Sequence, residues 1–146
     1  QFATRLPLDC SYNPSHFWAR QGKDDIWRVG FTKFATRMLG DMVDHDFETK
    51  PGTTIEPGQI LGWVEGFKAI SDVYGFCAGE FVGTNSALQE NIALISKKPY
   101  AAGWLYEARG TLDDKCVDAH GYVAILDQTI DKMLEQQQAG KGTDIE

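Results

Sequence analysis

The chain has 146 residues, of which 42% are hydrophobic and 24% are charged, a composition that fits one folded domain. Its 21 acidic and 14 basic residues give a net charge of -7, which argues against a nucleic-acid-binding surface of clustered Lys and Arg. No apolar run approaches the roughly 20 residues that a membrane helix needs, and no signal-peptide core follows Gln1. We expect a cytoplasmic protein that uses neither a membrane nor a nucleic acid as partner.

The cysteines fit a reducing compartment. Cys10, Cys77 and Cys116 are odd in number, far apart in the sequence and without the spacing of metal ligands. We expect reduced, partly buried thiols and no metal site. A redox role for one of them is the alternative.

The first predicted elements follow an irregular lead-in over 1–15. Strands are expected over 16–20 and Ile26–Phe31, because the polar segment 21–25 between them has the composition of a turn. These two strands form a predicted hairpin.

A short helix is expected next. Thr32 is a favourable N-cap, Lys33–Leu39 follows as the helix, and Gly40 is typical of a residue that ends one. A strand over Met42–Phe47 follows this helix.

The second half of the chain alternates strands and turns. Pro51-Gly52 and Pro57-Gly58 indicate turns, and apolar residues recur at helical spacing from Asp118 to about 135. We expect a polar, frayed tail over 136–146 after this C-terminal amphipathic helix. The remaining predicted strands are 60–65, 71–74, 80–82 and 103–108, with a helical turn over 86–90.

Many short strands between Gly and Pro turns indicate a mainly β fold, a β-sandwich or flattened barrel, as a single domain over 16–135. An internal similarity supports two related halves: segment 57–62 resembles segment 78–83 at an offset of 21 residues. Both copies have the pattern small, Gly, polar, apolar, apolar, Gly. Lys68 lies between the two copies, and this position predicts a hairpin that joins the halves.

Lys68 is the main candidate functional residue. It lies in the segment Glu65-Gly66-Phe67-Lys68-Ala69 between two predicted strands, where a tight turn exposes a side chain. Gly66 permits a close backbone approach, and Ala69 leaves space beside the lysine. A single accessible amine at a fixed place suits a modifying enzyme, whereas an ordinary solvated lysine is the alternative.

The order and spacing of several short segments give this chain a family resemblance. From about His16 to about Arg109 the sequence resembles the H protein of the glycine cleavage system, a lipoyl carrier. The matching segments are 12–18, 30–32, 39–41, 64–69, 71–74, 79–80, 85, 99–100 and 103–105.

The resemblance implies a lipoyl/biotinyl-type fold with lipoate attached to Lys68 through an amide. Biotinyl lysines usually lie between two methionines, whereas Lys68 lies between Phe67 and Ala69, and this favours lipoate. The cofactor carries the chemistry in such a carrier, so we predict no catalytic residues and no enzyme activity. The predicted cofactor-binding site around the attachment residue consists of Glu65, Gly66, Phe67, Ala69 and Asp72, and a lipoate ligase or lipoyl transferase is an expected partner. Asp72 would help that enzyme to recognise the loop, and an ordinary hairpin carboxylate is the alternative.

Two positions depart from the family pattern. Family members usually have a Glu after the His of the first motif, where it helps to hold the aminomethyl cargo, and this chain has Phe17. Phe17 cannot accept a hydrogen bond or pair with an ammonium. The common Ser and Val before the lysine are replaced by Gly66 and Phe67. We therefore predict a cargo pocket formed by Ser15, His16 and Phe17 that takes a different cargo. The alternative is that Phe17 and Phe67 are packing residues.

These departures resemble the lipoate-binding proteins of sulfur oxidisers, which work with a heterodisulfide-reductase-like complex. The main hypothesis is a carrier of sulfur intermediates. The alternatives are a true H protein, which serves the glycine cleavage enzymes, and an unmodified H-like binding module. On the first hypothesis, Phe17→Glu is expected to raise any residual glycine cleavage activity.

Three further residues have competing interpretations. His16 and His45 have no partner at catalytic spacing, and a structural or partner-facing role is favoured for both over that of a ligand or base. Cys77 is close to Lys68 in the sequence. A buried core thiol is favoured, and contact with the dithiolane is the alternative.

Overall fold

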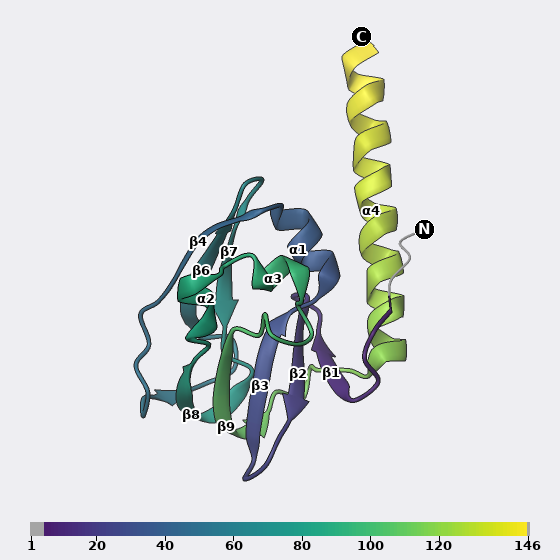
Figure 1. The fold of residues 1–146 in the computed structure, drawn as a ribbon. Coiled ribbons are helices and arrows are strands. Elements are labelled where there is room, and N and C mark those ends of the chain that lie inside the picture. Colours follow the sequence, from purple (N-terminus) through teal and green to yellow (C-terminus); the bar gives the residue numbers. More distant parts are fainter. Residues whose placement is uncertain (1–4, 146) are drawn as a thin grey trace.

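A computed structural model describes residues 5–145 of the chain, with side chains as far as Gln138. Within this range nine strands and four helices form two sheets with flanking helices (Figure 1). One sheet has six strands in the order β1-β2-β3-β9-β8-β5, and the other has three in the order β4-β6-β7. The elements are β1 (Cys10–Asn13), β2 (Phe17–Gln21), β3 (Ile26–Phe31), α1 (Lys33–Leu39), β4 (Met42–Phe47), β5 (Thr54–Ile55), β6 (Ile60–Gly66), β7 (Ile70–Tyr74), β8 (Cys77–Thr84), α2 (Ala87–Glu90), α3 (Leu94–Lys97), β9 (Tyr106–Leu112) and α4 (Ala119–Ile145).

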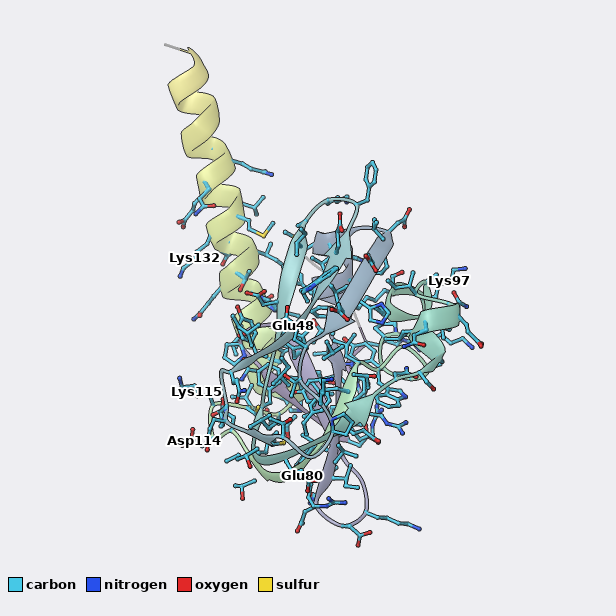
Figure 2. All side chains as sticks on the ribbon, turned by 90° about the vertical axis from the view of Figure 1, so that its left-hand side faces the viewer. Glu48, Glu80, Lys97, Asp114, Lys115 and Lys132 are labelled. Carbon is cyan, nitrogen blue, oxygen red and sulfur yellow. The ribbon has the colours of Figure 1, made fainter. Side chains whose placement is uncertain are left out.

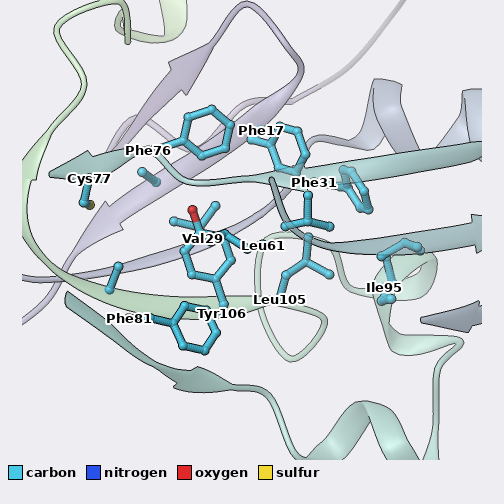
Figure 3. Packing of buried hydrophobic residues seen from close by; sticks show 14 of the residues in the cluster. Phe17, Val29, Phe31, Leu61, Phe76, Cys77, Phe81, Ile95, Leu105 and Tyr106 are labelled. Carbon is cyan, nitrogen blue, oxygen red and sulfur yellow. The ribbon is translucent and has the colours of Figure 1, made fainter. Parts of the chain in front are cut away.

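The hydrophobic core lies between the two sheets. Val29 and Tyr106 of the six-stranded sheet share one buried cluster with Leu61 and Val64 of the three-stranded sheet (Figure 3). Alternating side chains of each strand fill this space, as expected for two packed sheets. The prediction of a mainly β, flattened sandwich is confirmed.

The two copies of the internal similarity lie in opposite sheets. The first copy, 57–62, leads into β6 of the three-stranded sheet, and the second, 78–83, lies within β8 of the six-stranded sheet. Lys68 lies on the hairpin between β6 and β7, as the similarity predicts.

Helix α4 lies outside the sandwich and packs on the other side of the six-stranded sheet. Its residues Tyr122 and Leu126 form a second buried cluster with Tyr12, Trp18 and Phe34. The helix then continues past the sheets, at the same end of the molecule as the β6–β7 hairpin (Figure 1).

The predicted helix end near 135 is wrong, because α4 continues to Ile145. Three glutamines and an alanine follow Glu135, and these residues favour a helix even without a buried face. The side chains of 139–146, the last part of the predicted tail, lie outside the described residues.

The irregular lead-in over 1–15 contains a strand that the sequence does not reveal. β1 pairs with β2, and Tyr12 also forms an isolated bridge with Val117, which comes just before α4. Both partners lie outside the lead-in, and its own composition gives no strand signal. Residues 1–4 of the predicted lead-in lie outside the described part of the chain.

The last strand is also displaced from its predicted position. β9 covers Tyr106–Leu112 instead of 103–108. A Cβ on Gly103 would lie 2.1 Å from the carbonyl oxygen of Leu94, so this residue packs against α3 instead of joining the sheet. Gly110 has φ +142° and allows the strand to pass the β8 backbone closely. The short elements β5 and α3 were not predicted.

The predicted helix after Thr32 is confirmed. The Thr32 hydroxyl accepts a hydrogen bond from the Ala35 N–H, and Gly40 ends α1 with φ +79°. None of the helices within residues 5–145 combines the length and apolarity required to cross a bilayer. Charged side chains from several elements point outward, among them Glu48, Glu80, Lys97 and Lys132 (Figure 2).

Candidate functional site

Lys68 lies at the tip of the β6–β7 hairpin. The Gly66 N–H donates a hydrogen bond to the Ala69 carbonyl over 2.8 Å and closes the loop, while Phe67 and Lys68 form its bend. All four residues from Phe67 to Ile70 are exposed. The loop therefore presents the Lys68 side chain to solvent.

The tip is attached to the end of α1 by two backbone hydrogen bonds. Phe67 donates to the Asp41 carbonyl over 2.7 Å, and Lys68 donates to the Leu39 carbonyl over 2.8 Å. These bonds fix the backbone of the loop although its side chains are in water. Lys68 thus has a hydrogen-bonded backbone and an exposed side chain.

Two glycines make this attachment possible. The aliphatic stem of Lys68 lies over Gly40, where a Cβ would be 3.0 Å from the lysine Cγ. A Cβ on Gly66 would be 2.2 Å from the carbonyl oxygen of Leu39. The absence of side chains at both positions lets the hairpin and the helix end meet at backbone distance.

The amine of Lys68 forms none of the ion pairs found in the described part of the chain. It lies beside an open groove of about 410 Å³ between α1 and α3, which Thr36 and Ser96 help to line. Glu65 and Asp72, two predicted site residues, lie on the neighbouring strands, where Glu65 pairs with Ile70 and Asp72 pairs with Trp63. An exposed primary amine that no carboxylate among the described residues holds in an ion pair is accessible to an acylating enzyme.

The predicted cargo residues separate into different environments. Ser15 is exposed, and its N–H donates to the Asn13 side chain over 2.9 Å. Phe17 is 1% exposed, and its ring contacts Phe31 and Phe76 in the core (Figure 3). The core position of Phe17 speaks against direct contact with a cargo.

His16 belongs to a polar cluster that could not be predicted from the sequence. Its Nδ1 lies 2.8 Å from the Tyr122 hydroxyl, which lies 2.7 Å from the Thr32 hydroxyl. Burial lowers the pKa of His16 and raises that of Tyr122. Tyr122 of α4 is 106 residues from His16 and 90 residues from Thr32, so no local sequence signal reveals the cluster.

The other candidate groups have structural positions. Cys77 is fully buried in the core, and burial raises the pKa of its thiol to about 12, which keeps it protonated and a poor nucleophile. The cysteines within the described residues are all free thiols. His45 is partly buried on β4, opposite Val64 of β6.

Comparison with known proteins places this geometry in a family. A family model described as glycine cleavage H-protein matches residues 10–127. The chain belongs to the glycine cleavage H-protein family. Members of this family are carrier proteins that hold lipoate covalently on a lysine and serve the glycine cleavage enzymes.

Individual relatives agree with this assignment over nearly their full length. The chain is 40% identical over 124 residues to the glycine cleavage system H protein of Bacteroides fragilis, and 37% identical over 124 residues to that of Corynebacterium jeikeium. Each match covers 83% of this chain and 97% of the relative. A crystal structure of a glycine cleavage system H protein from Mycobacterium marinum superposes with a TM-score of 0.74 at 34% identity, over 82% of this chain and 97% of that chain.

The β6–β7 hairpin fits the family's lipoyl group. Lys68 is exposed, its stem has space over Gly40, and its backbone is held by Leu39. When attached, lipoate supplies a dithiolane that undergoes reduction and thiol exchange at the end of a long tether.

Proposed function

We propose that Lys68 is the lipoyl attachment residue of this family member. One observation carries the proposal: Lys68 is exposed at a hairpin tip whose backbone is fixed to α1 by the Leu39 and Asp41 carbonyls. Such a base holds the attachment point in place while the arm moves. The chain itself positions the arm and performs no bond-making step of its own.

We further propose that the cargo is the aminomethyl group of glycine cleavage. The names of the relatives in Bacteroides fragilis, Corynebacterium jeikeium and Mycobacterium marinum support this cargo. The partners are then the glycine cleavage enzymes, together with a lipoate ligase or lipoyl transferase that loads Lys68. An acidic surface, with a net charge of -7, favours partners with basic docking faces.

A second candidate function is the carriage of sulfur intermediates for a heterodisulfide-reductase-like complex. The observation in its favour is Phe17, which replaces the family's usual carboxylate by an aromatic ring buried among Phe31, Tyr74 and Phe76. A protein without that carboxylate has lost one partner for the ammonium of an aminomethyl cargo. The sequence comparisons give this candidate no support of their own.

The attachment site is tested by the intact mass of the chain expressed in a host that makes lipoate. We expect a mass gain of one lipoyl group that Lys68→Arg abolishes. Lys97→Arg, at an exposed lysine on α3, is the matched control and should retain the gain. An unmodified wild-type chain from its native host would favour the unmodified binding module instead.

The cargo is tested by reconstitution. The lipoylated chain is mixed with the glycine decarboxylase, aminomethyl transferase and dihydrolipoyl dehydrogenase components, and the release of CO₂ from labelled glycine is followed. Turnover comparable to that of a standard H protein supports the aminomethyl cargo. A lipoylated chain that gives no turnover would reject it and leave the sulfur carrier as the better candidate.

A further inference from the structure

An apolar groove lies between α1 and the C-terminal part of α4. Its volume is about 330 Å³, and its apolar lining consists of Phe34, Met38, Ile130, Met133 and Leu134. Leu134 is 52% exposed and Met38 is 45% exposed, so the groove leaves large apolar side chains in water. Contiguous apolar surface of this kind marks a place that another molecule covers.

One wall of the groove lies outside the part of the chain that matches the family. The family model ends at residue 127, whereas Ile130, Met133 and Leu134 come after it. The matches to the relatives in Bacteroides fragilis and Corynebacterium jeikeium already cover 97% of those proteins, so little of their length remains for such a wall. Partners that serve these relatives therefore do not require the groove.

The part of α4 that passes the sheets would gain stability from a second helix in the groove (Figure 1). Isolated helical segments of fewer than about 12–15 residues are marginal in water, and most helical stability in proteins comes from a packed apolar face. Ile130 and Met133 are partly buried against the second cluster, but Leu134 is not covered by its own fold. A helix laid along the groove would bury Leu134 and complete the apolar face of α4.

The charge of the groove favours a second copy of the chain as the source of that helix. In a symmetric dimer the same surface meets itself, so a net charge of one sign on that surface would repel. Arg37 is the one charged residue among the described residues that line the groove. In the segment 130–141 two acidic residues balance two basic residues, whereas the whole chain has a net charge of -7. This neutral surface is suited to contact between two acidic chains.

We propose that the groove is the contact surface of a homodimer in which the α4 helices of two copies pack against each other in antiparallel orientation. Leu134 of each copy fills the groove between α1 and α4 of the other. From Ile130 to Ile145 the helix is about 24 Å long, which gives about four turns of contact. No residue of the β6–β7 hairpin is among the described residues that line the groove, so the inference does not depend on lipoylation of Lys68.

The test is the oligomeric state of the full-length chain, measured by sedimentation velocity at concentrations from about 1 to 300 µM. We expect a reversible monomer–dimer equilibrium with a Kd on the order of 10 µM, because a contact of this size is small for a permanent complex. Leu134→Glu should raise the Kd about tenfold or more, because it places two like charges in an apolar contact. Circular dichroism should show that the variant retains its helices.

Ile60→Glu is the matched control. Ile60 is 58% exposed, comparable to Leu134, but it lies on β6 and does not line the groove. The variant introduces the same charge at another exposed apolar position, and its Kd should stay within about twofold of the wild-type value. A dimer that is equally tight in Leu134→Glu and Ile60→Glu uses another surface, and this result would overturn the inference.

A chain that stays monomeric at the highest concentration would also overturn the inference, and two further measurements would then identify the occupant. Faster reduction of the loaded arm by dithiothreitol in Leu134→Glu than in Ile60→Glu would assign the groove to the lipoyl arm. Weaker binding of a glycine cleavage enzyme to Leu134→Glu would assign it to that partner. The dimer is rejected in both cases, and the proposed function of Lys68 is unaffected.

Discussion

The backbone N–H of Lys68 donates a hydrogen bond to the carbonyl oxygen of Leu39 over 2.8 Å, which joins the β6–β7 hairpin to the last residue of α1. The position of the lysine therefore depends on how the helix ends. Gly40 determines that ending, since its φ of +79° and ψ of -164° lie in a region that is essentially restricted to glycine. A helix terminus and a hairpin thus form one unit, and a substitution at Gly40 should alter the position of Lys68.

The first prediction concerns Gly40→Ala. The new Cβ forces a strained backbone, at about 1–3 kcal/mol, and also meets the stem of Lys68 at 3.0 Å. We expect a loss of unfolding free energy in this range and a severalfold lower rate of lipoylation. Urea denaturation measures the unfolding free energy. The rate of lipoylation is measured by mass spectrometry of the chain during incubation with a lipoate–protein ligase, ATP, Mg²⁺ and lipoate.

Gly52→Ala is the control for this strain. Gly52 also has a positive φ, +90°, but a Cβ there would have no atom within 4 Å. It should reduce stability without changing the rate of lipoylation. Equal effects of both variants on lipoylation would show that the Gly40 contact with Lys68 has no consequence.

The second prediction concerns Gly66→Ser, which restores the usual residue of the family. A Cβ at this position would lie 2.2 Å from the Leu39 carbonyl oxygen, a backbone atom that has little freedom to move. The hairpin must then separate from α1, and overpacking of this kind reduces stability by about 1–3 kcal/mol. We expect faster amide exchange at Lys68 in the variant, measured by NMR.

Gly83→Ser is the matched control for the serine. Gly83 also lies in a strand, β8, and a Cβ there would have nothing within 4 Å. Its unfolding free energy should stay within about 0.5 kcal/mol of the wild-type value. If Gly66→Ser is as stable as this control, the close approach of hairpin and helix is not required.

Local signals allowed part of this structure to be predicted from the sequence. The cap at Thr32 and the stop at Gly40 define α1 with its observed bounds, because capping depends on a few adjacent residues. The hairpin around Lys68 followed from two strand patterns and the glycine between them. Both features depend on contacts between residues that are close together in the sequence.

Features that depend on distant partners could not be predicted. β1 exists because Tyr12 pairs with Trp18 of β2 and with Val117, more than 100 residues away. Phe17 was assigned to a cargo pocket because the family has a carboxylate at that position. The structure places its ring in the core, where only the tertiary fold brings Phe31 and Phe76 against it.

The third prediction corrects the expected effect of Phe17→Glu. From the sequence alone, the variant is expected to gain glycine cleavage activity, but Phe17 is 1% exposed. A carboxylate in this aromatic cluster would be buried without a partner, and the ring would be lost as well, which together reduce stability by about 3–5 kcal/mol. We expect a large fall in the melting temperature and no gain of activity.

Phe17→Leu is the control, because it retains an apolar side chain and should reduce stability by only about 1–2 kcal/mol. If Phe17→Glu is as stable as Phe17→Leu and has increased glycine cleavage activity, this prediction is wrong and position 17 belongs to the cargo site.

The last prediction concerns the pH dependence of stability through His16. Its ring packs on Phe34, its Nδ1 lies 2.8 Å from the Tyr122 hydroxyl, and burial lowers its pKa below the value of 6.5 that applies in the unfolded chain. Below pH 6.5 the unfolded chain therefore binds this proton more readily than the folded chain does. The contribution of neutral His16 to stability is complete above pH 6.5 and is lost as the pH falls from 6.5 towards the folded-state pKa.

His16→Asn removes this titration and retains a residue that tolerates the observed φ of +73°. We expect the difference in unfolding free energy between wild type and His16→Asn to be constant above pH 7 and to shrink on acidification below pH 6.5, as measured by urea denaturation at each pH. His120→Gln, at an exposed position on α4, is the control for the loss of a histidine as such. A difference that stays constant from pH 7.5 to pH 5, or that grows on acidification, would mean that His16 is not held neutral by its contacts with Phe34 and Tyr122.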